Sequence, residues 1–126
     1  MEHSHFVGID VSKSHLDVHV RPTGDSFRVP CDDAGLVTLI EQVRPLAPAV
    51  LVLEATGGYE VTVAATLASA ALPVAVVNPR QIRDFARATG QLAKTDTLDA
   101  RIIALFAEAV RPAARPAPPP PPPGSA

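Results

Sequence analysis

The first thirty residues alternate between apolar and polar positions in a pattern that predicts three short β-strands. Phe6 to Val11 is an apolar run with one acid, Asp10, near its end. The run from His15 to Arg21 has a strict period of two, which is typical of a strand with one buried face. Ser26 to Cys31 is a weaker run, and Pro30 favours a place at the sheet edge. Because only short turns separate these runs, we expect an antiparallel meander.

Beyond residue 32 the pattern changes to helices that alternate with buried strands. Apolar residues recur at helical spacing after Asp32 and Asp33, either of which can cap the helix, and Pro45 ends it. Continuous apolar runs at 49–53 and 74–77 fit strands that are buried on both faces of a parallel sheet. The predicted helices cover residues 36–43, 59–71, 80–88 and 95–110.

This order of elements predicts an α/β fold with a mixed five-stranded sheet, an antiparallel meander plus two parallel strands, flanked by helices. Right-handed crossovers place the strands at 49–53 and 74–77 parallel to the first strand, on its far side. Ligand sites in open α/β sheets lie outside the carboxyl ends of such strands. The side chains at those strand ends are therefore the first candidates for function.

Two acids stand at the ends of neighbouring predicted strands. Asp10 is near the end of the first strand, and Glu54 ends the strand that follows the first helix. In this topology both reach the same edge of the sheet. Two carboxylates side by side are electrostatically costly unless a positive group joins them. Mg²⁺ prefers hard oxygen ligands and often takes one or two carboxylates with phosphate oxygens and water, so a metal site is one interpretation.

Two further acids, Asp96 and Asp99, stand at the start of the last predicted helix. Their spacing of three places both on one helix face, from which they can complete a four-carboxylate cluster. Such a cluster can hold the two metal ions of phosphodiester cleavage. Simpler interpretations stay open, because Asp10 can be a plain strand-end acid and Glu54 an acid favoured by a helix dipole. Asp96 and Asp99 can equally be a helix N-cap and an N3 acid.

Basic residues form a stripe beside these acids and suit the phosphate backbone of a nucleic acid. Arg80, Arg83 and Arg87 share one helix face. Lys94 and Arg101 lie on either side of the acidic pair, and Lys13 is three residues after Asp10. The alternatives are a solvated helix face that Asp84 partly neutralises and, at position 13, an exposed turn lysine. The candidate phosphate-binding residues are Lys13, Arg80, Arg83, Arg87, Lys94 and Arg101.

Three weaker signals lie near the same strand ends. His15, Asp17 and His19 share one strand face and could hold a metal, although a polar strand face explains them as well. The glycine-containing segment 56–58 precedes a helix and could cradle a phosphate, or let the backbone pass close to the metal site. We expect Tyr59 to be a packing residue near that site.

Composition narrows the function classes only a little. Hydrophobic residues make up 47% of the 126 residues, so the main body is not intrinsically disordered. No apolar run approaches the ~18–20 residues that cross a bilayer, and the start lacks the pattern of a signal peptide. We therefore expect a cytoplasmic protein with no membrane partner, and a half-buried thiol at Cys31. The formal net charge of −2 does not indicate nucleic acid, so that partner depends on the local stripe.

Proline is distributed very unevenly. Of the 14 prolines, 8 fall within residues 112–126, where 118–123 is an unbroken run. Such a segment has no side chains for a core and adopts polyproline II or stays disordered. We therefore expect one domain over residues 1–111 and a proline-rich disordered tail over residues 112–126.

Four segments resemble motifs of the DEDD transposases of the insertion-sequence-110 family, in the family's order. The resemblance runs from Phe6 to Val110 and implies the RuvC-like branch of the RNase H fold. The segments are V-G-I-D-V-S-K at 7–13, L-E-A-T-G-G-Y-E at 53–60, N-P-R-Q-I-R-D-F-A-R-A at 78–88 and K-T-D-T-L-D-A-R at 94–101.

The resemblance also implies a chemistry and partners. It places the family's acidic tetrad on Asp10, Glu54, Asp96 and Asp99, with Mg²⁺ or Mn²⁺ as the cofactor for DNA strand breakage and joining. DNA, a structured guide RNA and further copies of the chain are the implied partners. Family members are similar to two-part proteins whose second domain carries a serine nucleophile, and no serine here matches that motif. We therefore expect a chain that is incomplete for transposition: a truncated copy, a frame-shifted remnant or an accessory domain.

Two other functions remain compatible with the sequence. A non-catalytic module could keep the fold and bind guide RNA or DNA while it self-associates. An actin-like kinase fragment could also open with a G-I-D strand and hairpin, because an acid there holds a magnesium nucleotide. That kinase fold needs at least about twice this length, and the paired acids at 96 and 99 have no place in it.

Overall fold

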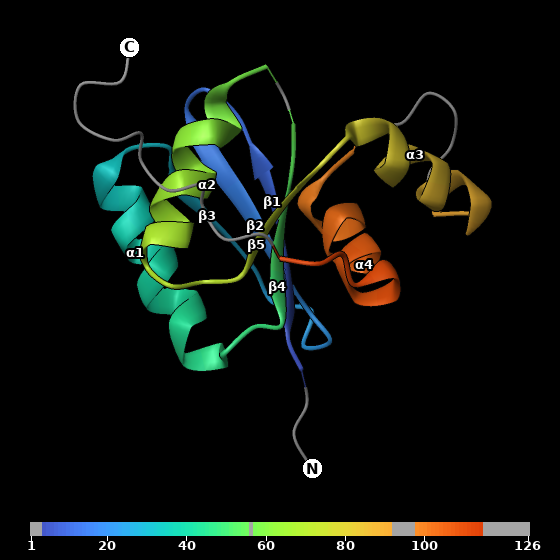
Figure 1. The fold of residues 1–126 in the computed structure, drawn as a ribbon, viewed down its shortest axis with the longest axis horizontal. Helices are drawn as coiled ribbons and strands as arrows, with labels where there is room; N and C mark the ends of the chain where they lie inside the picture. Colours follow the sequence, from blue (N-terminus) through green and yellow to red (C-terminus); the bar gives the residue numbers. More distant parts are fainter. Residues whose placement is uncertain (1–3, 56, 92–97, 115–126) are drawn as a thin grey trace, which may run out of the picture.

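The computed structural model describes residues 4–55, 57–91 and 98–114 and has a mixed β-sheet between two layers of helices (Figure 1). Within these residues, no helix is long and apolar enough to cross a membrane. The elements in chain order are β1 (Phe6–Val11), β2 (His15–Arg21), β3 (Ser26–Pro30), α1 (Asp33–Val43), η1 (Arg44–Leu46), β4 (Val50–Glu54), α2 (Tyr59–Ser69), β5 (Val74–Val77), α3 (Pro79–Ala88) and α4 (Ala100–Val110).

The strand order in the sheet is β3-β2-β1-β4-β5. Strands β1 and β2, and β2 and β3, pair antiparallel, whereas β1 and β4, and β4 and β5, pair parallel. The predicted meander with two added parallel strands is confirmed, and this α/β topology is that of an RNase H-like fold. Strand β3 lies at the edge, where Pro30 ends it without interrupting a ladder on both sides.

The two faces of the sheet bury different clusters. One face packs under α1 and α2 and includes Val7, Ile9 and Leu53 among its fully buried residues. The other face lies under α3 and α4 and includes Phe6 and Val52. Figure 1 shows the sheet nearly edge-on, with α1 and α2 on one side and α3 and α4 on the other. Alternate residues of β1 and β4 therefore serve two separate cores.

Helix α4 lies directly across β1, and Gly8 makes this contact possible. A Cβ at Gly8 would overlap backbone atoms of Ala100 and Ala104, so only glycine lets the helix come this close. At the other end of α4, the guanidinium of Arg111 lies 5.1 Å from the centre of the Phe6 ring. The helix therefore runs antiparallel to β1, and its first residues lie at the carboxyl end of that strand.

Some helix boundaries agree with the sequence pattern and others differ. Asp32 caps α1, because its Oδ1 accepts a hydrogen bond of 2.7 Å from the Gly35 N–H. Helix α1 ends at Val43, and Pro45 lies in the 3-10 turn η1 that follows it directly. Helix α2 ends at Ser69 because Ala71, the predicted end, has a left-handed φ of 63°.

The expected start of the last helix at residue 95 is wrong for Leu98 and Asp99. Both lie outside α4, and Asp99 has an extended backbone with φ −128° and ψ 174°. Leu98 is apolar and in phase with the helix, so the pattern placed it inside. It is buried, but it precedes the first helical residue. Residues 95–97 lie outside the described part of the chain.

Candidate metal and nucleic-acid site

Asp10 and Glu54 lie side by side at the carboxyl edge of the parallel strands. In the ladder between β1 and β4, Ile9 is the partner of Leu53, so the next residue on each strand is an acid. Both acids lie on the face of the sheet that α4 covers. Gly8 and Val52 are on this face, and each acid comes two residues later on the same strand. The expected neighbourhood of these two carboxylates is therefore present in the fold.

Ionisation of both carboxylates is unfavourable, because the pKa of each is raised. Burial raises the pKa of Asp10, and the charges of Asp17 and Asp99 raise it further, while His15 acts in the opposite direction. Burial also raises the pKa of Glu54, with Asp10 adding to the effect and Arg83 opposing it. Each shift has burial as its largest cause. A cation bound between Asp10 and Glu54 would offset the repulsion among these negative charges.

One oxygen of Glu54 lacks a hydrogen bond within the part of the chain that the structure describes. Its Oε2 is buried and has no hydrogen-bond partner among the described residues. Buried polar atoms are nearly always paired, because an unpaired one costs about 1–3 kcal/mol. A carboxylate oxygen of this kind is a suitable donor for a hard divalent cation.

Asp99 reaches the same edge by a different route from the one predicted. It is the N-cap of α4, and its Oδ1 accepts a hydrogen bond of 2.9 Å from the Ile102 N–H. The prediction that Asp99 sits inside the first helical turn, on one face with Asp96, is wrong for Asp99, because a capping residue has to leave the helical conformation. Asp96 lies outside the described residues.

The antiparallel course of α4 over β1, not the spacing of three, brings Asp99 close to Asp10. Both acids line a surface hollow of about 340 Å³. The negative charge of Asp99 raises the pKa of Asp10, in agreement with this closeness. Within residues 4–55, 57–91 and 98–114, however, no three side chains of His, Cys, Asp or Glu form a group that could hold a metal ion.

Asp17 is a further acid at this edge, which the sequence suggested only as part of a weak metal interpretation with His15 and His19. It is the direct partner of Asp10 in the β1–β2 ladder, on the same face. Arg28 donates to it from Nε at 2.7 Å and from Nη2 at 3.4 Å, and His15 Nε2 lies 3.4 Å from Asp17 Oδ2. Its place opposite Asp10 follows from the register of the hairpin, in which residues 10 and 17 are equally far from the centre of the turn.

His19, on the same face of β2 as Asp17, is buried and packs against β3. His19 is only 8% exposed, and its Nδ1 lies 2.6 Å from Ser26 Oγ on β3. Burial lowers the pKa of His19, and the positive charges of Arg21 and Arg101 lower it further. A polar strand face, the simpler of the two interpretations, accounts for these contacts.

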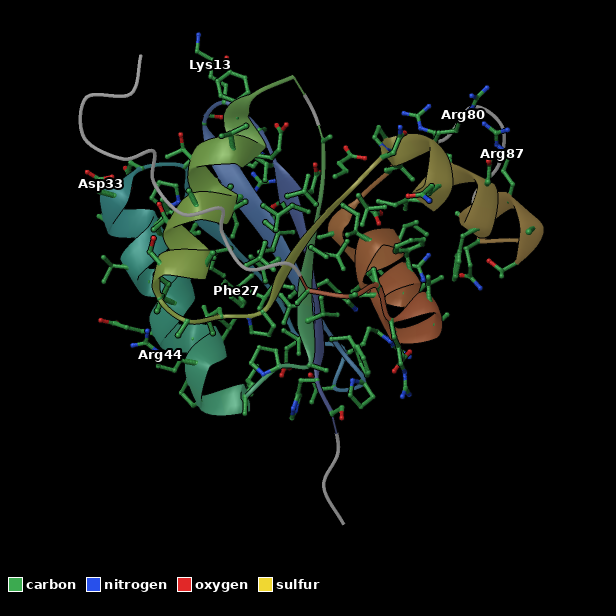
Figure 2. All side chains as sticks on the ribbon, in the orientation of Figure 1. Lys13, Phe27, Asp33, Arg44, Arg80 and Arg87 are labelled. Carbon is green, nitrogen blue, oxygen red and sulfur yellow. The ribbon has the colours of Figure 1, made fainter. Side chains whose placement is uncertain are left out.

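The arginines of α3 lie together, as their spacing predicts. Asn78 caps the helix, since its Oδ1 accepts a hydrogen bond of 2.8 Å from the Arg80 N–H, and Ile82 and Ala86 form the buried side. Figure 2 shows Arg80 and Arg87 on α3, on the opposite side of the molecule from Asp33 and Arg44 of α1. A hollow of about 440 Å³ is lined by Asn78, Pro79, Arg80, Arg83, Asp84 and Arg87.

Arg83 links this stripe to the acidic edge. Strand β5 leads into α3, and its last residue, Val77, is the ladder partner of Glu54. The positive charge of Arg83 lowers the pKa of Glu54, whereas Arg80 and Arg87 are not among the causes of that shift. The stripe therefore extends outward from the acids along α3.

The other basic candidates are more scattered. Lys13 is exposed in the turn after β1, at the end of the molecule where α2 begins (Figure 2), and it lines a separate hollow with Asp33 and Tyr59. Arg101 is exposed in the first turn of α4, near enough to His19 to lower its pKa. Lys94 lies outside the described residues.

The segment before α2 differs in part from expectation. Tyr59 is 51% exposed, so its predicted role as a packing residue is wrong; it precedes the buried side of α2, which begins at Glu60. Gly57 and Gly58 have φ values of 96° and 126°, which other residues rarely adopt. Thr56 is outside the described residues, and the phosphate-cradle interpretation of this segment stays a prediction.

A sequence model of one protein family matches nearly the whole chain. The family is DEDD_Tnp_IS110, described as a transposase, and the match covers residues 7–122. This range includes every candidate site residue and continues into the proline-rich segment. A comparison with curated proteins found no match.

Proposed function

The chain belongs to the DEDD transposase family of the insertion-sequence-110 type, and on that premise we propose that its acidic sheet edge binds a divalent metal for DNA strand cleavage and joining. The observation that supports this most is the pair Asp10 and Glu54 on adjacent parallel strands. The pKa of each is raised, chiefly by burial, and Glu54 has a buried oxygen without a hydrogen-bond partner among the described residues. Asp99 shares a hollow with Asp10, and the family resemblance adds Asp96.

The donor set suits Mg²⁺ or Mn²⁺. All four proposed ligands, Asp10, Glu54, Asp96 and Asp99, offer hard carboxylate oxygens, and neither histidine nor cysteine is needed. A metal bound there would supply charge for the phosphate and a more acidic water. The protein's part is to hold Asp10 and Glu54 on rigid strands and Asp99 at a helix start that packs over Gly8.

DNA would approach along the arginines. Arg83 lies nearest to Glu54, and Arg80 and Arg87 continue outward along α3, so a strand whose phosphate reaches the acids can be held by the stripe. Lys13, Lys94 and Arg101 are proposed as additional phosphate contacts. Such contacts position a strand without reading its sequence, and they make affinity depend on salt.

Calorimetric titration with Mn²⁺ tests the metal site. We expect binding by the wild type, and Asp10→Asn should weaken it at least about tenfold because a charged ligand is lost. Glu41→Gln is the matched control, since Glu41 is exposed on α1, across the sheet from the site. Equal Mn²⁺ affinity in wild type and Asp10→Asn would sink the proposal.

A second candidate function is nucleic-acid binding without cleavage. The observation in its favour is that the arginine hollow is formed by residues 78–87 alone, whereas no three-ligand metal group is present among the described residues. This function predicts salt-dependent DNA binding that survives removal of metal and is lost in an Arg80/Arg83/Arg87→Ala variant. Binding that requires Mg²⁺ and Asp10 together would favour the catalytic site instead.

The remaining proposals are supported by the family resemblance. They comprise a structured guide RNA as a second ligand, self-association, a cytoplasmic location and dependence on a serine-bearing second domain for full transposition. The division into a domain over residues 1–111 and a proline-rich tail is likewise a proposal. The family match over residues 7–122 favours a transposase function above an actin-like kinase fragment.

A further inference from the structure

Four charged residues form one row across the sheet at its functional edge. The β2–β3 ladder pairs Asp17 with Arg28, the β1–β2 ladder pairs Asp10 with Asp17, and Glu54 continues the row on β4. Three of the four are acids, and the fourth, Arg28, ends the row on the edge strand. Arg28 is separate from the basic stripe of α3, which lies beyond Glu54 at the opposite end of the row.

Asp17 holds the guanidinium of Arg28 in a fixed orientation. Arg28 donates two hydrogen bonds, from Nε to Oδ1 at 2.7 Å and from Nη2 to Oδ2 at 3.4 Å. His15, 3.4 Å from Asp17, supports the same carboxylate. A two-point contact between arginine and carboxylate sets the plane of the guanidinium as well as its position.

Stability gives little reason for this pair. The side chains are 63% and 31% exposed, and exposed ion pairs contribute only about 0–1 kcal/mol. Asp17 also lies directly opposite Asp10 in the β1–β2 ladder, and like charges in that arrangement are unfavourable. An acid in this position is therefore better explained by what it does to Arg28.

Arg28 lines the same hollow as Asp10 and Asp99, two of the proposed metal ligands. The hollow of about 340 Å³ is lined by Asp10 and Asp99 and also by Asp17 and Arg28. Among the described residues, Nη1 of Arg28 makes no hydrogen bond, so it remains free to donate to a ligand there. The hollow thus combines acids that attract a metal with one oriented cationic donor that suits a phosphate oxygen.

We propose that Arg28 binds a phosphate of the DNA strand at the acidic edge and that Asp17 is the positioning residue that orients it. This inference rests on the proposed function, because it places DNA at the acids. Arg28 and the α3 arginines would then hold the strand from both ends of the charged row. The acids would lie between the two points of attachment, where the reacting phosphate has to be.

The test measures binding of the full chain to a labelled 30-base-pair duplex in Mg²⁺ at several salt concentrations. Arg28→Gln should weaken binding about five- to tenfold and lower the salt slope by about one phosphate contact. Asp17→Asn should weaken binding about threefold with the slope unchanged. The double variant should be no weaker than Arg28→Gln, because both changes remove one interaction.

Two further variants keep the test decisive. Arg44→Gln removes an exposed arginine from the far side of the molecule and should leave affinity and slope unchanged. Arg28→Lys keeps the charge but loses the two-point contact, so it should keep the slope and lose affinity even if the glutamine variant folds poorly.

Three results would overturn the proposal. Wild-type affinity and slope in Arg28→Gln would remove Arg28 from the site while leaving the metal proposal untouched. Effects of Asp17→Asn and Arg28→Gln that multiply in the double variant would show that Asp17 does not act through Arg28. A wild type that does not bind the duplex would overturn this inference and the proposed DNA site together.

Discussion

The two faces of the sheet are formed by the same strands, but they carry different side chains at the carboxyl ends of those strands. Under α1 and α2, the residues of β1 and β4 are apolar to the last position, with Val11 and Leu53 both buried. Under α4, the same strands begin apolar and end in Asp10 and Glu54. The first face therefore serves stability along its whole length. On the second face the last position of each strand is an acid. The cost shows in the raised pKa values of both acids and in a buried Glu54 oxygen that lacks a hydrogen-bond partner among the described residues.

The largest expected effect lies on the apolar face. Leu53→Ala should lower the free energy of unfolding by about 2–5 kcal/mol, because it removes a fully buried side chain and leaves a cavity. Urea unfolding measures the change, and the neighbouring Glu54→Ala is its comparison on the same strand. If Glu54→Ala costs as much as Leu53→Ala, the contrast between the faces is wrong.

The next effect concerns the contact between α4 and β1. Gly8→Ala should lower stability by about 1–3 kcal/mol, since its Cβ would meet the backbone of Ala100 and Ala104. It should also weaken Mn²⁺ binding, because α4 carries Asp99. Ala65→Gly, at an exposed helical position of α2, is the control: it should cost about 1 kcal/mol and leave Mn²⁺ affinity unchanged. Unaltered Mn²⁺ affinity in Gly8→Ala would contradict the role given to the helix position.

A smaller effect of opposite sign is expected at the acidic edge. In the presence of a chelator, Glu54→Gln should raise the free energy of unfolding by about 0.5–1 kcal/mol, because it removes a charge that burial and Asp10 both disfavour. Chelator-treated protein in urea gives the measurement. A clear loss of stability would show that the negative charge of Glu54 is already compensated within the protein.

The smallest effect is a pH dependence at His19, beside the same edge. Its pKa is lowered in the fold, so the stability that the neutral ring contributes is complete above about 6.5 and is lost as pH falls below that value. His19→Gln should flatten this dependence between about pH 5 and 7. The comparison requires thermal unfolding of both proteins across that range, and identical profiles would contradict the assignment.

Much of this architecture could be predicted from the sequence. The alternation in β2 and the apolar runs of β4 and β5 gave the strands, and the right-handed crossover placed β4 beside β1. The neighbourhood of Asp10 and Glu54 followed from that topology alone. The face shared by Arg80, Arg83 and Arg87 followed from helical spacing.

The rest depended on contacts that a linear pattern does not contain. Leu98 continues the helical period but precedes the helix, so Asp99 could not be recognised as the cap. Asp17 was visible as a polar residue, but its place opposite Asp10 required the strand register. The hollow that Arg28 shares with Asp10 and Asp99 exists only after α4 has packed over Gly8.

Thermal unfolding with and without Mn²⁺ tests the central claim most directly, namely that the acidic edge is held for a cation at a cost in stability. At a concentration of 100 times the dissociation constant, binding should stabilise the wild type by about 2.7 kcal/mol, or roughly 10–20 °C for a domain of this size. Asp10→Asn should be at least as stable as wild type in chelator and should respond little to Mn²⁺. A wild type that does not respond to Mn²⁺, or an Asp10→Asn protein that responds equally, would contradict the account.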